Sequence, residues 1–588
     1  MSTSDTNLSP SPQLAARLAD PALAHRHEPI EKTQTRGWCI WLLWLSVTCI
    51  AGLRLYWNRY TMGPDGVSYI DAADLFRGGH WIRGVNGLWG PLYSLLIAGV
   101  LRVAAPLRTQ EVVVAHVANF IIFMLGAGAF LFFWKAFLEE VIRRIPATRN
   151  TRDSVWWDVI GCSLYAFTAF NVYTLPTMSP DLLVQASLTA AAGFLLRLSG
   201  SKSNSGNIIG LGAVLGLGYL AKAVVLPLAI VFFVLAFWRT GRTRKAVQRL
   251  LPGLAVFLLI AAPYVYAMSQ RKGRLSLGDA SRLNYAWKIS WDYMPEEMWD
   301  GEPVGTGSPV HPPRRIQSSP DIFEFASPID GTYPPWLDPP YWNEGLTAPF
   351  RPGKQLRALA VNFATLAKVT ILDDREVTLC FLFLVVCIWR KPTASGISSE
   401  LNWTLFLIAA AGFGLYCLIH VEQRYFGALD IFLWAAVLGY AAPRFTEDRR
   451  LLRAMGISLF VAVLSANGLV VRNEYSHRKQ KDTNLETAEA LLAQGIKSGD
   501  RVAVIGSGAE AAWAQIAGLR ITVMVPSSRP GLSDSPEAMF WENNQRMSES
   551  LAVIRSTGVV AVISQQPPPF EQRGWERLGS TTRYVLKF

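Results

Sequence analysis

The stretch that decides the fold is EVVVAHVANFIIFMLGAGAFLFFW at residues 111–134, followed by a segment rich in Lys and Arg at residues 135–154. A helix of this length rises about 36 Å, more than the roughly 30 Å hydrocarbon core of a bilayer. Similar apolar runs lie at residues 37–56, 111–134, 155–174, 181–198, 207–221, 224–240, 250–268, 376–391, 402–419, 426–442 and 454–471. The sequence therefore predicts a polytopic α-helical membrane protein with about 11–13 spans.

The composition of the 588 residues agrees with this prediction. Hydrophobic residues make up 51% of the chain and charged residues only 17%, against roughly 25% in soluble domains. The net charge of +12 could suggest a nucleic-acid partner, but the surplus lies in short connectors between apolar runs, where it sets orientation. All six cysteines lie in or beside those runs, so neither a disulfide framework nor a zinc motif is implied. We therefore expect membrane lipids as partners and no nucleic acid.

Basic connectors predict the orientation of the chain. Lys and Arg gather at residues 135–154, 239–249 and 443–453, and such segments stay on the cytoplasmic side. With the N-terminus also cytoplasmic, an even number of spans must separate residue 36 from residue 135. The assignments therefore agree only if the run at 88–107 does not cross the membrane. Its glycines, prolines and Arg102 favour a helix that lies at the outer interface or re-enters the membrane. Five segments then fall outside: the loop 57–87, the turn 175–181, the turn at Lys222, the long loop 269–375 and the turn 420–425.

The expected organisation has five parts. They are a cytoplasmic tail at 1–36, a transmembrane module at 37–270 that contains the first outer loop 57–87, an extracytoplasmic loop rich in aromatic residues and proline at 271–375, transmembrane helices at 376–472, and a small α/β domain at 473–588. Alternation of the spans puts the α/β domain outside. The basic residues just after the last span favour the opposite side, but charges that lead into a folded domain weigh less than those in short loops.

The C-terminal domain has a glycine turn, Gly506-Ser507-Gly508, between an expected strand at 501–506 and an expected helix at 509–517. Further strands are expected at 520–525, 559–564 and 583–588, with a helix at 540–556. Such a turn could bind a nucleotide, but Ala511 holds the place of the third glycine and no acidic residue ends the next strand near Val525. A tight turn is the favoured interpretation.

The predicted outer face gathers an unusual set of charged residues. Ionisable side chains near membrane level are costly and are by default functional candidates. The alternative is that charges at helix ends extend to the interface without a further role. The set comprises Asp65, Asp71, Asp74, Arg77, Arg83, Asp181, Lys222, Glu422 and Arg424.

The order in which short motifs occur on this face is informative about the type of protein. They are Asp65, Tyr69 and Gly78 in the first outer loop, Trp89-Gly90-Pro91-Leu92-Tyr93, Met178-Ser179-Pro180-Asp181, Gly216 to Lys222, and Glu422-Gln423-Arg424-Tyr425. The set resembles integral membrane glycosyltransferases of the GT-C fold, particularly bacterial relatives of protein O-mannosyltransferases and of lipid A aminoarabinose transferases. The resemblance covers residues 37–270 well. It departs from the family where Trp89-Gly90 replaces a common Lys or His, and where Asp65-Gly66 offers one carboxylate instead of two.

The resemblance implies a reaction and roles for residues. A sugar would move, with inversion, from a polyprenyl-phosphate carrier to a hydroxyl of a glycan, lipid or protein acceptor at the periplasmic face of a bacterial inner membrane. Asp65 would be the general base and Asp181 a second acid. Lys222 and Arg424 would bind the donor phosphate, with Arg77 and Arg83 as alternates, and Tyr69, Tyr93, Glu422 and Tyr425 would contact substrate. No metal ligands or certain cofactor are expected, and dependence on a divalent metal stays open.

Other interpretations compete with this one. A lipid transporter or flippase predicts charges midway along spans and an internal repeat, and neither is found in the sequence. A non-catalytic scaffold is disfavoured because Asp65 and Asp181 are both present. For Arg424, an ion pair with Glu422 is an alternative to phosphate binding. The aromatic loop could cover an acceptor or could simply collect at the headgroup level.

Overall fold

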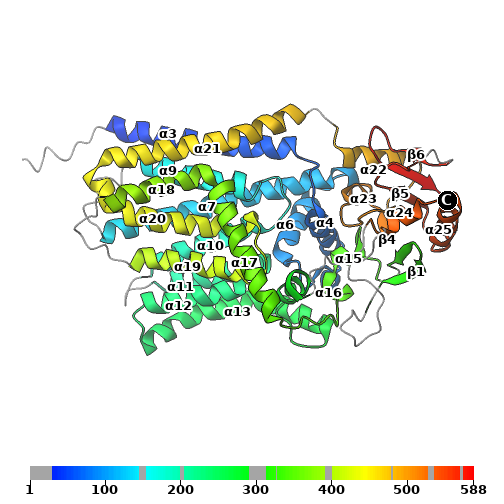
Figure 1. Cartoon of the computed structure of the whole chain (residues 1–588). Helices are drawn as coiled ribbons and strands as arrows, with labels where there is room; N and C mark the ends of the chain where they lie inside the picture. The colour runs from blue at the N-terminus through cyan, green and yellow to red at the C-terminus, as the bar shows by residue number, and fades with distance from the viewer. Residues whose placement is uncertain are drawn as a thin grey trace, which may run out of the picture.

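The computed structural model describes residues 30–144, 154–198, 204–290, 311, 313–325, 328–390, 400–478, 481–527, 535–569 and 574–588. The predicted N-terminal tail and parts of the first basic connector and of the long loop therefore lie outside the described residues. Long helices form a bundle at one end of the molecule, and a sheet domain lies at the other end, with α4, α6, α15 and α16 between them (Figure 1).

Each of the eleven predicted runs forms a helix. These helices are α3 (Ile30–Trp57), α7 (Glu111–Arg144), α9 (Val155–Phe167), α10 (Asp181–Leu196), α11 (Ser205–Ala221), α12 (Val225–Arg239), α13 (Arg244–Lys272), α18 (Arg375–Arg390), α19 (Glu400–Cys417), α20 (Gly427–Glu447) and α21 (Arg449–His477). Within the described ranges, five are long and apolar enough to cross a membrane by themselves, at Gly37–Trp57, Arg108–Arg144, Arg244–Lys272, Gly427–Glu447 and Arg449–His477. The expected polytopic helical architecture is confirmed.

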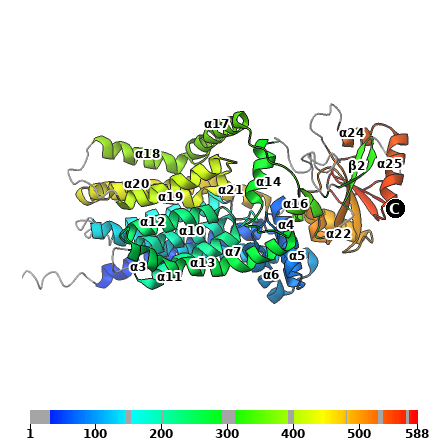
Figure 2. The same ribbon diagram turned by 90° about the horizontal axis from the view of Figure 1, so that it is seen from below.

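Apolar side chains on the outside of the bundle suit lipid and not water. Leu259 on α13 is 72% exposed, and Leu379 and Phe383 on α18 are each 62% exposed. Contiguous exposed apolar surface of this kind is rare on soluble monomers. The amphipathic helix α17 (Pro352–Lys368) lies at the edge of the bundle near α18 (Figure 2), and its Leu356 and Phe363 are also exposed.

The ambiguous run at 88–107 forms α6 (Pro91–Ala104), which has 14 residues. Such a helix is about 21 Å long and too short for the hydrocarbon core. It packs against α7 and against α4 (Pro64–Arg77), and α4 and α5 (Trp81–Gly84) form the first outer loop. This position agrees with the expectation of a helix that does not cross.

The end of the bundle that carries the basic connectors is held together by a buried ion pair. Arg239, at the end of α12, lies 3.0 Å from Glu140 on α7. The same guanidinium donates to the carbonyl oxygens of Leu195, Leu196 and Leu198 and so satisfies the free carbonyls at the end of α10. The C-terminal ends of α7, α10 and α12 therefore meet at one end of the bundle, and Asp181 at the start of α10 lies at the opposite end.

The C-terminal domain contains α22 (Thr483–Ala493), α23 (Ala512–Ala517), α24 (Pro536–Phe540), α25 (Asn544–Ser556) and a seven-stranded sheet of order β1-β2-β4-β3-β5-β7-β6. Its strands β3 (Arg501–Ile505), β4 (Arg520–Val525), β5 (Ala561–Ser564) and β7 (Tyr584–Lys587) match the expected ones, and β6 (Glu576–Arg577) is added at the edge. Strands β1 (Arg314–Ser318) and β2 (Asp321–Glu324) come from the long loop, and β2 pairs with β4. The domain and the long loop therefore lie on the same side of the bundle.

Other residues of the protein contact the backbone of the glycine turn after β3. The side-chain amide of Gln565 accepts from the Ser507 N–H at 3.2 Å and donates to the Ser507 carbonyl at 2.7 Å. The Gly508 N–H points to the Met524 sulfur at 3.3 Å. Backbone donors that would hold a nucleotide phosphate are thus already occupied, which agrees with a tight turn.

The orientation can be tested by cysteine labelling. Ser318→Cys in β1 and Ser556→Cys in α25 should react with an impermeant maleimide on intact cells, because the long loop and the C-terminal domain are expected outside. Lys245→Cys, at the start of α13, should react only after permeabilisation. Labelling is measured above the background of the wild-type protein, whose six cysteines lie in apolar runs. The reverse pattern would contradict the orientation.

Candidate active site

Helix ends at one end of the bundle carry the predicted site residues. Asp65 lies in the first turn of α4, where Pro64 starts the helix after an extended Gly63. Asp181 is the first residue of α10, Lys222 follows the last residue of α11, and Arg424 lies in the 3₁₀ turn η8 (Gln423–Tyr425) before α20. Breaks between helices therefore bring these charged groups to one level of the bundle.

Arg424 is the centre of the cluster. Its Nη1 lies 3.0 Å from Oδ2 of Asp65, and its Nε lies 2.6 Å from Oε2 of Glu422. The same Nε is 3.8 Å from Oδ2 of Asp181. The planar guanidinium can serve several carboxylates because it carries five N–H donors in a fixed arrangement. One arginine thus joins acids from α4, α10 and the turn before α20.

Lys222 is the second cation of the cluster. Its Nζ lies 2.5 Å from Oδ1 of Asp181 and 3.8 Å from the centre of the Tyr425 ring. Tyr416 at the end of α19 stacks on Tyr425 with ring centres 4.8 Å apart. The ammonium is therefore held by a charge on one side and by an aromatic face on the other.

The cluster is partly open to solvent and short of positive charge. The Asp65, Lys222 and Arg424 side chains are each about one-quarter exposed, whereas Asp181 is only 4% exposed. Oδ2 of Asp181 accepts no hydrogen bond from the described residues, apart from its longer ionic contact with Arg424. Three carboxylates face two cations, which leaves one negative charge in excess when His420 is neutral.

Glu422 is strongly fixed in its charged form. Burial alone would raise its pKa, but the hydrogen bond with His420 at 3.0 Å and the charge of Arg424 lower the pKa of Glu422 well below its ordinary value. The carboxylates of Asp181 and Asp65 in turn raise the pKa of Arg424, despite burial, which would lower it. Both groups therefore remain charged at any physiological pH.

Close backbone packing sets the positions of the helix ends. A side chain at Gly90 would collide with the carbonyl oxygens of Leu220 and Ala221, so the start of α6 rests directly on the end of α11 beside Lys222. A side chain at Gly427 would collide with the ring of Tyr173, whose hydroxyl accepts from the Ala428 N–H at 2.9 Å. These contacts give a physical reason for glycine at positions 90 and 427.

Tyr69 and Tyr93 lie behind the cluster and not in its open part. Both are buried, and their rings meet edge to face with centres 4.9 Å apart. The Tyr93 hydroxyl donates to Oδ1 of Asn119 at 2.6 Å. Burial, together with the charges of Asp65 and Asp181, raises the pKa of Tyr69 well above its ordinary value. These tyrosines form a wall next to the acids.

Arg77 and Arg83 are engaged elsewhere. Arg77 pairs with Asp74 at 2.9 Å and with Glu111 at 2.6 Å, and Arg108 joins the same group. Arg83 forms a two-point ion pair with Asp330 in the long loop. Both arginines therefore pair with acids outside the cluster of Lys222 and Arg424.

Asp71 ties the first outer loop to the C-terminal domain, a role that sequence reasoning missed. Its Oδ2 accepts from the Thr332 N–H at 2.7 Å and its Oδ1 from the Thr332 hydroxyl at 2.9 Å. The Thr332 carbonyl in turn accepts from the N–H of Ile521 in β4 at 2.8 Å. Helix α4, which carries Asp65 in its first turn, is thus anchored to the sheet. No local sequence pattern indicates the roles of Thr332 and His420. Asp71, the partner of Thr332, is distant in the sequence, and a nearby glutamate such as Glu422 is an ordinary neighbour for His420.

Within the described ranges, no group of three or more His, Cys, Asp or Glu side chains converges in a way that could hold a metal ion.

No protein-family model and no curated protein sequence matches the chain. Solved structures that are similar include ArnT from Cupriavidus metallidurans bound to undecaprenyl phosphate, at 13% identity over 93% of this chain and 97% of that chain, with a TM-score of 0.41. They also include the Archaeoglobus fulgidus oligosaccharyltransferase tethered with an acceptor peptide, at 14% identity over 89% of this chain and 69% of that chain, with a TM-score of 0.46. Both are GT-C fold glycosyltransferases.

The Asp71 anchor predicts a pH dependence of stability. Burial raises the pKa of Asp71 from 3.8 to about 6, although Thr332 and Arg108 oppose the shift. Because the folded protein binds this proton more tightly than the unfolded chain, folding stability should decrease as the pH rises between these values, by up to about 3 kcal/mol. Asp71→Asn should flatten this part of the profile, measured as the Tm of detergent-solubilised protein from pH 4 to pH 7. Equal slopes in the variant and the wild type would contradict the prediction.

Proposed function

We propose that the chain is an integral membrane glycosyltransferase of the GT-C type. It would transfer a sugar from a polyprenyl-phosphate donor to an acceptor hydroxyl, with inversion, at the extracytoplasmic face of a bacterial inner membrane. The observation that carries the proposal is the joining of Asp65, Asp181 and Glu422 with Lys222 and Arg424 in one half-open cluster. A general base and phosphate-binding cations are the groups that this chemistry needs.

Asp65 is the proposed general base. It opens α4 and is about one-quarter exposed, whereas Asp181 is almost fully covered. The acceptor oxygen attacks the anomeric carbon from the face opposite the phosphate, and its proton passes to Asp65. A new bond forms between the acceptor oxygen and the anomeric carbon, and the bond from that carbon to the phosphate oxygen breaks with its electron pair. The configuration at the anomeric carbon is therefore inverted.

Lys222 and Arg424 are proposed to receive the leaving phosphate. The donor is a phosphodiester with one negative charge, and the released polyprenyl phosphate gains a second. Cations that contact the phosphate therefore stabilise the transition state more than the bound donor. Lys222 offers a point charge and Arg424 a flat pair of N–H donors that matches two phosphate oxygens.

The cluster carries one negative charge in excess, and this affects how Arg424 binds a phosphate. In the structure its N–H groups are shared between Asp65 and Glu422. A phosphate that binds Arg424 competes with Asp65 for the same donors, so donor binding would loosen the ion pair of the base. Asp65 would then be free to accept the proton of the second substrate.

An apolar groove supports a lipid-linked donor. A groove of about 480 Å³ lies between α12, α17 and α19, lined by Pro227, Val231, Leu359, Phe363, Gly414 and Cys417 among others. Helix α12 begins just after Lys222, and α19 ends just before His420 and Glu422. The groove thus begins near the cluster and could take the first part of a polyprenyl tail.

Asp65→Asn tests the base. Asparagine keeps the size of the side chain and can still accept hydrogen bonds at a helix start, but it cannot take a proton. Transfer of labelled sugar from polyprenyl phosphate should decrease about 100- to 10,000-fold, with donor binding retained. The exposed Asp373→Asn is the matched control and should transfer normally. Wild-type rates for Asp65→Asn in the purified assay would exclude this role.

Lys222→Ala tests the phosphate contact. Loss of one charge-assisted hydrogen bond should weaken use of the donor about 10- to 100-fold, measured as kcat/KM for the polyprenyl-phosphate sugar. Lys368→Ala at the end of α17 serves as the matched control because that lysine is exposed. Unchanged donor kinetics in a folded Lys222→Ala protein would mean that Lys222 merely extends to the interface.

A further inference from the structure

A second pocket lies on the same end of the molecule, apart from the charged cluster. It has a volume of about 290 Å³ and lies between α5, the end of α13 and the short helices α15 (Pro334–Leu337) and α16 (Pro339–Trp342). This volume is close to the lower limit of ordinary ligand pockets, roughly 300 Å³. Its polar lining consists of Arg83, Arg271, Asp330 and Asp338, and Pro334, Leu337, Tyr341 and Trp342 supply apolar surface.

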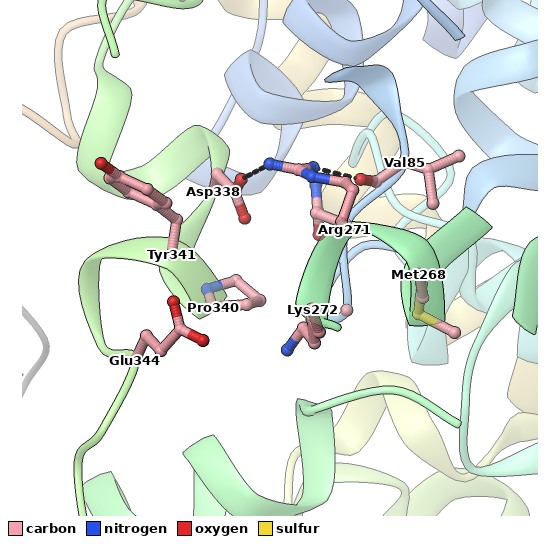
Figure 3. A pocket seen from close by; sticks show the side chains of 10 residues that line it. Val85, Met268, Arg271, Lys272, Asp338, Pro340, Tyr341 and Glu344 are labelled. Atoms are coloured by element: carbon pink, nitrogen blue, oxygen red, sulfur yellow. Dashed lines mark hydrogen bonds and ion pairs between the residues drawn. The ribbon is translucent and has the colours of Figure 1, made fainter. Parts of the chain in front are cut away.

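The charges that line this pocket are already balanced. Arg83 pairs with Asp330, and Arg271 pairs with Asp338 at 2.5 Å. Figure 3 shows the pair of Arg271 and Asp338, with Tyr341 beside it, in a smaller neighbouring pocket that shares these three residues. Each guanidinium keeps further N–H donors and each carboxylate keeps free lone pairs. The pocket therefore offers both hydrogen-bond donors and acceptors but no net charge.

The pocket is connected to the helix of the proposed base. Leu337 in its lining follows Trp336, whose carbonyl accepts from the Ser68 hydroxyl at 2.8 Å and from the Trp89 indole at 3.0 Å. Ser68 lies one turn after Asp65 in α4. The short helix α15 thus lies between the pocket and the start of α4. It lines the pocket through Leu337, and its Trp336 carbonyl accepts the hydrogen bond from Ser68 of α4.

We propose that this pocket binds an uncharged pyranosyl unit of the acceptor. A pyranose presents hydroxyl groups that both donate and accept, around C–H faces that pack on apolar and aromatic side chains. The balanced Arg–Asp pairs and the walls of Tyr341 and Leu337 match that pattern. The assignment of the unit to an acceptor rests on the proposed glycosyltransferase function.

Direct binding to the purified full-length protein tests the pocket without relying on catalysis. Saturation-transfer difference NMR would be recorded with methyl α-D-glucopyranoside, methyl α-D-mannopyranoside and the methyl glycoside of N-acetylglucosamine. D-Glucuronate and inorganic phosphate are the charged comparisons. At least one uncharged glycoside should bind to the wild type and to Arg102→Gln, an exposed control outside the pocket. Affinity should decrease about 10-fold in Arg83→Gln and in Tyr341→Ala.

The outcomes separate this proposal from the proposed function. Binding of pyranosides that Asp65→Asn retains and Arg83→Gln loses supports the pocket, even if no transfer activity is found. Arg83→Gln changes an exposed residue and keeps the test valid if Tyr341→Ala fails to fold. The proposal is overturned if no uncharged glycoside binds to the wild type, if binding survives Arg83→Gln unchanged, or if only the charged probes bind.

Discussion

The ion pairs of Arg424 are the interaction on which the candidate site depends. Carboxylates from α4, α10 and the turn before α20 lie near one another at the end of a helical bundle, where their mutual repulsion is poorly screened. Arg424 contacts Asp65 and Glu422 directly and Asp181 at longer range, and Lys222 neutralises Asp181 from the other side. Removal of the arginine would leave the carboxylates facing one another, so these contacts hold the helix ends together. The proposed phosphate site uses the same arginine.

The rest of the architecture holds this cluster in place. Glycines let α6 rest on the end of α11 and let α20 rest on Tyr173, so the charged residues that follow or precede these contacts have little freedom. The long loop contributes two strands to the C-terminal sheet, and Thr332 joins that sheet to Asp71 in α4. The C-terminal domain thus supports α4, the helix that carries Asp65.

Much of the fold could be predicted because it depends on local patterns. Apolar runs specify helices in a membrane, since backbone groups there must be satisfied within the segment. The strands β3, β4 and β5 were visible as short β-rich runs. Strands β1 and β2 were not, because both are short and β2 pairs with β4, about two hundred residues later in the chain. Orientation rules placed Asp65, Asp181, Lys222 and Arg424 on one face, but they could not show that Arg83 pairs with Asp330 or that Asp71 pairs with Thr332. Such pairings depend on the folded loop. The chemical roles of the clustered residues remain a prediction.

The most direct test of the central claim is a structure of the purified protein with polyprenyl phosphate bound. The phosphate should lie within hydrogen-bond distance of Lys222 Nζ and the Arg424 guanidinium, with its lipid tail in the groove between α12, α17 and α19. The distance between Arg424 and Asp65 should increase from 3.0 Å as the phosphate takes over the donors. A phosphate ordered at the opposite end of the bundle, near Arg239, or one bound elsewhere with the Arg424–Asp65 pair intact, would contradict the account.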